Sequence, residues 1–434
     1  MANLKTNFAG IQSPNPFWLA SGPPTDKAYN VNRAFEAGWG GVVWKTLGED
    51  PHVVNVNGPR YAALYGSDRK VIGFNNIELI SDRTLADNLK EIRQVKRDWP
   101  DRPIIASVML PMNEASWAKH MPMIEDTGVE GFELNFGCPH GMSERGMGSA
   151  VGQVPEYVTM VTEWAKKHTD LPVIVKLTPN VTNILHPAHA AKAGGADAVS
   201  LINTINSIMR IDYDSLSIYP TTDGMGTHGG YCGEAVKPIA LHMVAEIARS
   251  AETRGFPISG IGGVTTWRDA VDFLALGATN VQVCTAAMIY GFKIVEGLIE
   301  GLNDFLDEKG MASVHDLVGR AIPTVTDWKY LNLNYIEKAV INQDLCIECG
   351  KCHIVCEDTS HQAITHSVDG VRRFVVKDEA CVGCNLCVSV CPIENCITMK
   401  RLTEGTDPRT GQVISQTPAN WTTHPHNPTK TGDA

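Results

Sequence analysis

The chain has 434 residues, of which 43% are hydrophobic and 20% charged, and its formal net charge at pH 7 is −11. This length fits one large domain with a smaller one, and the composition is that of a globular protein with a sizeable core. The acidic excess speaks against nucleic acid or an anionic membrane as partner, and no apolar run is long enough for a membrane span. The first residues also lack the apolar stretch of a secretory signal, so we expect a cytoplasmic protein.

Short apolar runs alternate with amphipathic stretches over roughly the first 300 residues, the usual length of an eight-unit barrel. Eight of these runs are rich in Val, Ile, Phe or Leu, which is typical of strands buried on both faces. In chain order they are 16–21, 41–45, 104–108, 131–136, 173–177, 198–202, 257–261 and 280–283.

Glycines recur just before several of these strands, at Gly38, Gly128, Gly195 and Gly277. A glycine in this place ends a helix in a left-handed cap before the chain enters the next strand. Eight strand–helix units predict a (β/α)8 TIM barrel. The alternative, an open doubly wound sheet, usually has fewer strands and a dinucleotide-binding fingerprint.

One segment has the glycine spacing of that fingerprint, with Gly224, Gly226 and Gly229. The fingerprint requires a strand directly before it and a helix directly after it. Here turn-forming residues 219–223 precede the glycines. We therefore expect a glycine-rich loop over the barrel mouth, and no nicotinamide site on this chain.

Nine of the twelve cysteines lie between residues 346 and 396, in two copies of the spacing C-x2-C-x2-C-x3-C followed by one further cysteine. In a reducing compartment this spacing indicates metal ligands, and in two-cluster ferredoxins the fourth cysteine of each copy serves the other cluster. A structural zinc site, the alternative, needs only four ligands. Glu357 replaces the proline that usually follows the fourth cysteine, and we expect Cys396 to be a buried small side chain. The predicted ligands are Cys346, Cys349, Cys352 and Cys391 for one 4Fe–4S cluster, and Cys381, Cys384, Cys387 and Cys356 for the other.

These patterns predict a barrel over residues 1–306 and a connector over 307–340. A small ferredoxin-like α+β domain with two 4Fe–4S clusters would follow over 341–402. Residues 403–434 are polar and have almost no apolar periodicity, so we expect an extended or disordered tail that a partner subunit could order.

Iron–sulfur clusters carry single electrons, so the barrel is expected to hold a flavin that converts them to two-electron chemistry. Barrels bind a cofactor phosphate at the loops after the seventh and eighth strands. Glycines and a helix start occur there and would bring main-chain N–H groups to an anion, although tight turns alone would look similar. The predicted residues are Gly262, Gly263, Cys284, Thr285 and Ala286.

Residues 134–142, Leu-Asn-Phe-Gly-Cys-Pro-His-Gly-Met, and 144–148, Glu-Arg-Gly-Met-Gly, resemble the active-site loop of dihydropyrimidine dehydrogenases. A shorter Asn-x-x-Cys-Pro version occurs in the related dihydroorotate dehydrogenases. The resemblance continues through Lys176 to Asn180, Asn203-Thr204, Lys237-Pro238 and both cysteine motifs.

The resemblance implies FMN in the barrel and a pyrimidine beside it. Cys138 would give a proton to C5 of the pyrimidine while reduced FMN gives hydride to C6, and a near-normal thiol pKa would suit this role. Asn113 could instead simply cap a helix, and a lone cysteine is most often inert core. The implied pyrimidine contacts are Asn76, Asn113, Asn135, Asn203 and Thr204. Lys45 and Lys176 would lie near the flavin ring, with Ala20 and Ser21 lining it.

The resemblance further implies a bacterial-type enzyme that reduces uracil or thymine to the 5,6-dihydropyrimidine. NAD(P)H and FAD would bind a partner subunit in a hetero-oligomer and supply electrons through the clusters. One alternative is a dihydroorotate dehydrogenase or another flavin oxidoreductase acting on a cyclic imide. A second is an electron-transfer iron–sulfur flavoprotein without pyrimidine turnover.

Overall fold

The computed structural model describes residues 1–367, 372–402, 404–406, 413–414 and 419–429. The chain forms two compact units, Met1–Val325 and Thr326–Ala434. Their boundary lies inside the connector expected over residues 307–340. Of the tail expected over 403–434, residues 403, 407–412, 415–418 and 430–434 lie outside the described part of the chain.

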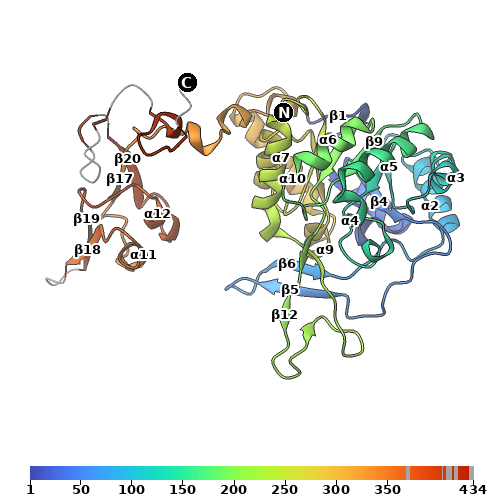
Figure 1. The fold of residues 1–434 in the computed structure, drawn as a ribbon, viewed down its shortest axis with the longest axis horizontal. Coiled ribbons are helices and arrows are strands. Elements are labelled where there is room, and N and C mark those ends of the chain that lie inside the picture. The colour runs from blue at the N-terminus through green and yellow to red at the C-terminus, as the bar shows by residue number, and fades with distance from the viewer. Residues whose placement is uncertain (368–371, 403, 407–412, 415–418, 430–434) are drawn as a thin grey trace. The chain divides into compact units, whose positions relative to one another are not determined.

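Eight parallel strands of the first unit close into a barrel, each hydrogen-bonded to the next along the chain and the last to the first (Figure 1). The predicted barrel is therefore confirmed, and each predicted strand contains one of these eight except the second, since β4 runs two residues beyond the predicted 41–45. They are β3 (Phe17–Leu19), β4 (Gly41–Leu47), β7 (Ile104–Val108), β8 (Gly131–Asn135), β9 (Val173–Lys176), β10 (Ala198–Leu201), β15 (Ile258–Ile261) and β16 (Asn280–Val283).

Helices connect successive strands and cover the outside of the barrel (Figure 1). Helix α1 ends at Gly38, whose φ of 111° is left-handed, and Gly128, Gly195 and Gly277 also have positive φ, as predicted from the sequence. No helix formed by the described residues is both long and apolar enough to cross a membrane. The outer helices are α1 (Ala28–Ala37), α2 (Leu85–Asp98), α3 (Glu114–Glu125), α5 (Pro155–Lys167), α6 (Leu185–Ala193), α7 (Lys237–Arg249), α8 (Trp267–Ala275) and α10 (Ile294–Glu308).

The amino-terminal hairpin, β1 (Thr6–Phe8) and β2 (Ile11–Ser13), closes one end of the barrel. Phe8 and Ile11 are buried there against Trp18 and other side chains from the beginnings of the barrel strands. Figure 1 shows β1 at the opposite end of the barrel from two further strands, β5 (Tyr61–Tyr65) and β6 (Val71–Asn76). The carboxyl ends of the strands are thus left as the open end.

A second, antiparallel sheet stands over this open end and was not predicted from the sequence. Its order is β11-β14-β6-β5, so it joins two insertions that are far apart in the chain. The glycine-rich loop expected there connects two strands, β13 (Ile218–Tyr219) and β14 (Gly229–Cys232), and does not lead from a strand into a helix as the dinucleotide-binding fingerprint requires. The strands are β5 (Tyr61–Tyr65), β6 (Val71–Asn76), β11 (Ile205–Ser207) and β14 (Gly229–Cys232), and a hairpin of β12 (Arg210–Ile211) and β13 (Ile218–Tyr219) extends from them.

The segment after α10 packs on the barrel rather than leaving it. Val314 and Leu317 are buried in the barrel core, and the main chain of Asn3 hydrogen-bonds with Ala312 and Val314. The first half of the expected connector is therefore part of the first unit. Its two core side chains, Val314 and Leu317, lie three residues apart on a single 3-10 turn, too short a pattern to mark a core element in the sequence.

The second unit repeats a loop and a short helix. Helix α11 (Lys351–Glu357) follows the first cysteine loop, and α12 (Leu386–Val390) follows the second. Strands β17 (Glu337–Ile341) and β20 (Ile397–Arg401) pair antiparallel, as do β18 (Ile364–Ser367) and β19 (Arg373–Val376). This is the predicted ferredoxin-like α+β architecture.

Part of the carboxyl-terminal segment is structured, contrary to the extended tail that we expected. Residues 421–423 form a 3-10 helix, and the Trp421 ring packs edge-on against Trp328 at 5.8 Å between centroids. Thr422 and Asn427 are buried. Two tryptophans far apart in sequence supply this contact, which composition alone does not show.

Phe273 provides a test of the barrel packing. It lies on α8, is fully buried, and approaches Gly260 of β15 so closely that a Cβ there would lie 2.5 Å from its ring. Phe273→Ala should lower the free energy of unfolding by about 3–5 kcal/mol, because it leaves a cavity between helix and strand. Urea unfolding followed by near-UV circular dichroism measures this. Ile239→Ala on α7, where the side chain is 43% exposed, is the control and should cost about 0.5 kcal/mol or less. Equal losses in the two variants would contradict the packing described.

Candidate active site

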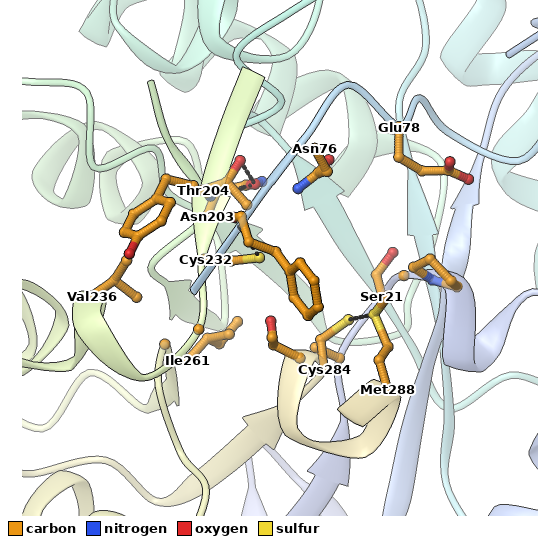
Figure 2. Close-up of a pocket in the computed structure, with 18 of the residues that line it drawn as sticks. Ser21, Asn76, Glu78, Asn203, Thr204, Cys232, Val236, Ile261, Cys284 and Met288 are labelled. Carbon is orange, nitrogen blue, oxygen red and sulfur yellow. Dashed lines mark hydrogen bonds between the residues drawn. The ribbon is translucent and has the colours of Figure 1, made fainter. Parts of the chain in front are cut away.

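The open end of the barrel holds a cavity of about 1350 Å3, including the solvent at its mouth. Strand ends form its floor, and β6 and β14 of the antiparallel sheet form one wall. Figure 2 shows Asn76, Asn203 and Thr204 around the same space as Ser21 and Cys284. The predicted residues that line the cavity are Cys138, Asn76, Asn135, Asn203, Thr204, Ala20, Ser21, Lys45, Lys176, Gly262, Gly263, Cys284, Thr285 and Ala286.

Asn113 is the exception among the predicted barrel residues. It is the amino-terminal cap of α3, where its Oδ1 accepts a hydrogen bond from the Ala115 N–H at 3.1 Å. It is absent from the described residues that line the cavity. The structure thus shows the helix cap that the sequence had left open as the alternative.

Asn135 ends β8 and Asn203 follows β10, two strands further around the barrel, and their side-chain amides contact each other. Asn203 Nδ2 donates to Asn135 Oδ1 at 2.9 Å, and Asn135 Nδ2 donates to the Thr46 hydroxyl at 2.9 Å. A Cβ at Gly137 would lie 2.3 Å from the Asn203 Cβ, so only glycine permits this approach. The pair is therefore held in one orientation at the edge of the cavity.

Cys138 is a buried thiol on the cavity wall, with 8% of its surface exposed. Its Sγ donates to the main-chain oxygen of His140 at 3.5 Å. Burial raises the pKa of the thiol from about 9 to about 11, so our expectation of a near-normal pKa is wrong. At neutral pH the side chain holds its proton.

Lys176 reaches the cavity floor from β9 beside a fully buried carboxylate. Its Nζ lies 3.4 Å from Glu133 Oε1, and Glu133 also accepts from the Ser200 hydroxyl at 2.8 Å and from Gln282 Nε2 at 3.1 Å. A buried lysine requires such an anion. Glu133 thus fixes the position of the Lys176 ammonium.

Lys45, from β4, has a carboxylate partner of its own. Its Nζ lies 2.8 Å from Glu78, which also pairs with Arg60 at 3.0 Å. The main-chain oxygen of Glu78 accepts from His140 Nε2 at 3.0 Å, which ties this ion pair to the loop of Cys138. Burial lowers the pKa of His140, so its imidazole is neutral at neutral pH.

The cavity has features that fit FMN. Gly262 and Gly263 follow β15 and have positive φ, which favours glycine, and a Cβ at Gly263 would lie 2.8 Å from the Cβ of Lys237. Because neither residue has a side chain, their main-chain groups line the cavity directly. After β16, α9 (Thr285–Tyr290) begins at Cys284 with no side chain of the described residues capping its N–H groups. The hydroxyl of Tyr231 is also buried at the wall without a hydrogen-bond partner in the described chain. These are donors for an anionic or polar group.

The cysteines of the second unit gather in two groups of four around two small cavities. Each cavity takes three cysteines from one motif and the fourth from the other, which is the crossed arrangement predicted from the sequence. Cys396 is buried beside the first group. Cys346, Cys349, Cys352 and Cys391 line a cavity of about 320 Å3, and Cys356, Cys381, Cys384 and Cys387 line one of about 380 Å3.

Several cavity residues were missed by sequence reasoning. Glu78 follows Asn76, an expected pyrimidine contact, by two positions and could have been found as a charge close to it in the sequence. Tyr231 and Cys232 lie on β14, and the Cys232 thiol donates to the Phe74 oxygen of β6 at 3.5 Å. No sequence signal pairs these two strands, because about 150 residues separate them, as is common for non-local sheets.

Comparison with known proteins places this geometry in a family. The profile of the dihydroorotate dehydrogenase family matches residues 3–306, and that of a 4Fe-4S dicluster domain matches residues 339–399. The chain belongs to the dihydroorotate dehydrogenase family. It is 41% identical to the NAD-dependent dihydropyrimidine dehydrogenase subunit PreA of Escherichia coli (strain K12), over 84% of this chain and 88% of the relative.

Two further relatives are named after different enzymes, one a dihydropyrimidine dehydrogenase and one a dihydroorotate dehydrogenase. The chain is 42% identical to the chloroplastic dihydropyrimidine dehydrogenase (NADP(+)) of Arabidopsis thaliana, over 75% of this chain and 78% of that one. It is 37% identical to the catalytic subunit of dihydroorotate dehydrogenase B (NAD(+)) of Pyrococcus abyssi, over 74% and 99%. The predicted resemblance to dihydropyrimidine dehydrogenases is confirmed, and the chain is an oxidoreductase. The matches also support FMN and iron–sulfur clusters as its cofactors.

The raised pKa of Cys138 predicts slow alkylation of this thiol at moderate pH. Because only the thiolate reacts, carboxamidomethylation of Cys138 by iodoacetamide should increase up to about pH 11 rather than level off near pH 9. Peptide mass spectrometry of the flavin-free protein, with glutathione as the unburied reference thiol, measures the pH profile. A half-maximal rate at the same pH for both thiols would show that burial does not control this cysteine.

Proposed function

We propose that this chain is the catalytic subunit of an enzyme that reduces uracil or thymine to the 5,6-dihydropyrimidine, with NAD(P)H as the electron source. The observation that carries the proposal is the convergence of the Cys138 thiol with the Asn135 and Asn203 amides in one cavity. The names of the E. coli and Arabidopsis relatives support it.

The amides suit the edges of a pyrimidine, which present alternating N–H donors and carbonyl acceptors. Each carboxamide offers two N–H groups and one carbonyl oxygen. In the Asn203–Asn135–Thr46 chain, each amide uses one N–H within the protein, which leaves the second for a substrate carbonyl. Asn76, on β6, and Thr204 would complete the contacts from the opposite wall and from the strand end. Asn113 is left out of this set, because its side chain caps α3 and is absent from the described residues that line the cavity.

Cys138 would act as the general acid that delivers a proton to C5. A thiol with a pKa of about 11 is protonated before the reaction, and its buried thiolate would regain a proton readily afterwards. The hydrogen bond to the His140 oxygen, which adjoins the Glu78–Lys45 pair, orients the sulfur. The same contacts position the loop that carries Cys138.

We further propose which residues hold FMN. Lys45 and Lys176 would lie by the ring with Ala20 and Ser21, and the phosphate would meet the main chain of Gly262, Gly263, Cys284, Thr285 and Ala286. When bound, FMN supplies the hydride for C6. The carboxylate of Glu133 keeps the Lys176 ammonium at the floor, where it would stabilise negative charge on a neighbouring ring.

The charges at the cavity favour a neutral pyrimidine over orotate. Orotate carries a carboxylate and would require a cation free to pair with it. Among the described residues that line the cavity, Lys45 pairs with Glu78 and Lys176 with Glu133, so neither lysine is free to pair with a substrate carboxylate. Uracil and thymine place no charge in this site.

The two cysteine groups are proposed as the ligands of two 4Fe–4S clusters that pass single electrons to the barrel. Main-chain N–H groups of Ala339 and Ala363 donate to Cys381 Sγ at 3.5 Å and to Cys356 Sγ at 3.2 Å, as expected around thiolate ligands. We propose that FAD and the nicotinamide bind a partner subunit, since the E. coli relative is named as a subunit. The unpaired thiols fit a reducing compartment such as the cytoplasm.

Cofactor analysis tests the assignment directly. The protein purified under anaerobic conditions should contain about eight irons per chain, from two four-iron clusters, and one FMN. Iron and acid-labile sulfide assays, with flavin extraction and chromatography, measure these contents. Zinc in place of iron, or FAD in place of FMN, would contradict the proposal.

Cys138→Ala tests the acid. Dithionite-driven turnover of uracil should fall by about 10²–10⁴-fold, the usual contribution of a general acid, while flavin and iron contents stay unchanged. Cys232→Ala, which removes another thiol of the cavity wall, is the matched control and should lose far less. Unchanged uracil turnover in Cys138→Ala, or faster turnover of orotate than of uracil by the unmodified protein, would overturn the proposed reaction.

A further inference from the structure

We propose that Lys338 raises the reduction potential of the cluster bound by Cys356, Cys381, Cys384 and Cys387. This cluster would then be reduced in preference to the second cluster of the unit. We call these two the Lys338-side cluster and the far cluster, the latter bound by Cys346, Cys349, Cys352 and Cys391. The inference rests on the proposed function, because it takes both cysteine groups to be cluster ligands.

Lys338 is the second residue of β17 and is only 5% exposed. Its Nζ donates to the main-chain oxygen of Cys381, and the N–H of the adjoining Ala339 donates to Cys381 Sγ. Ala339 also lines the cavity of this cysteine group. One strand therefore brings both an ammonium and an amide to the same cysteine.

The ammonium has no carboxylate partner within ion-pair distance among the described residues, and a single carbonyl accepts from it. A buried charge with so little compensation is costly unless an anion lies close. A 4Fe–4S cluster with four thiolate ligands is such an anion, and reduction adds one further negative charge to it. The cation therefore stabilises the reduced cluster more than the oxidised one, which raises the reduction potential.

The far cluster has no comparable cation among the described residues. Two cations adjoin this group: Arg372, whose guanidinium lies beside Gly350 and over the Phe374 ring, and Lys351, which precedes Cys352, but both side chains are exposed. Solvent and salt screen an exposed charge far more than a buried one. His361, at the wall of the Lys338-side cavity, is also more exposed than Lys338. The burial of Lys338 thus makes the two otherwise similar sites electrostatically unequal.

Lys338→Met and Lys338→Gln in the full-length protein test the inference. Glutamine can still donate to the Cys381 oxygen but carries no charge, so the two variants separate charge from hydrogen bonding. Redox titration monitored by electron paramagnetic resonance measures both potentials. Cys384→Ser and Cys349→Ser, which alter one exposed ligand of each group, assign the signals to the Lys338-side and the far cluster.

We expect both Lys338 variants to lower the potential of the Lys338-side cluster by the equivalent of about tenfold in its reduction equilibrium, or about 59 mV for one electron. The far cluster should keep its potential. Arg372→Met is the matched control, with a smaller effect on the far cluster that disappears at high salt.

A wild-type potential in Lys338→Gln would overturn the inference, because the hydrogen bond and not the charge would then be responsible. Unchanged potentials in both variants, with about eight irons still bound, would overturn the inference and leave the proposed function standing. Iron analysis of the unmodified protein that finds no second cluster would instead refute the cluster assignment itself.

Discussion

The closure of eight parallel strands is the constraint on which the candidate site depends. In a closed parallel barrel every carboxyl strand end opens on the same side, so residues far apart in sequence meet there. Lys45 near the end of β4, Asn135 at the end of β8 and Cys284 after β16 share one cavity for this reason. The amino-terminal hairpin fills the opposite end with Phe8 and Ile11. The cavity is thus a direct result of strand direction.

Within that cavity, the pairing of charges limits what can bind. Both lysines are held by carboxylates, one from the barrel interior and one from the insertion that precedes α2. The neutral amides of Asn135 and Asn203, by contrast, retain hydrogen-bonding groups. A site arranged in this way can position a polar uncharged ring, and the proposed thiol acid adds no charge before it reacts.

Much of this could be predicted from the sequence, because the signals are local. Each barrel strand is a short run of apolar residues, each glycine cap precedes its strand, and the cysteine spacing itself predicted the crossed groups. The antiparallel sheet over the mouth could not be predicted, since its strands pair across long separations and are only partly buried. The same holds for the Trp328–Trp421 contact.

The pKa of Cys138 was misjudged because burial is a property of the fold and not of the Cys-Pro motif. Asn113 was expected to contact the pyrimidine, with a helix cap as the alternative, and the structure shows the cap. One side chain can serve either role, and the sequence does not distinguish them.

The crossed cysteine groups have a consequence for how the second unit matures. Cys391 lies at the end of the second motif but belongs to the first group, and Cys356 of the first motif belongs to the second group. Neither half of the unit therefore has a full ligand set by itself. With the proposed ligands, a fragment that ended between the motifs could complete neither metal centre, so both motifs must be present before either cluster can be fully bound.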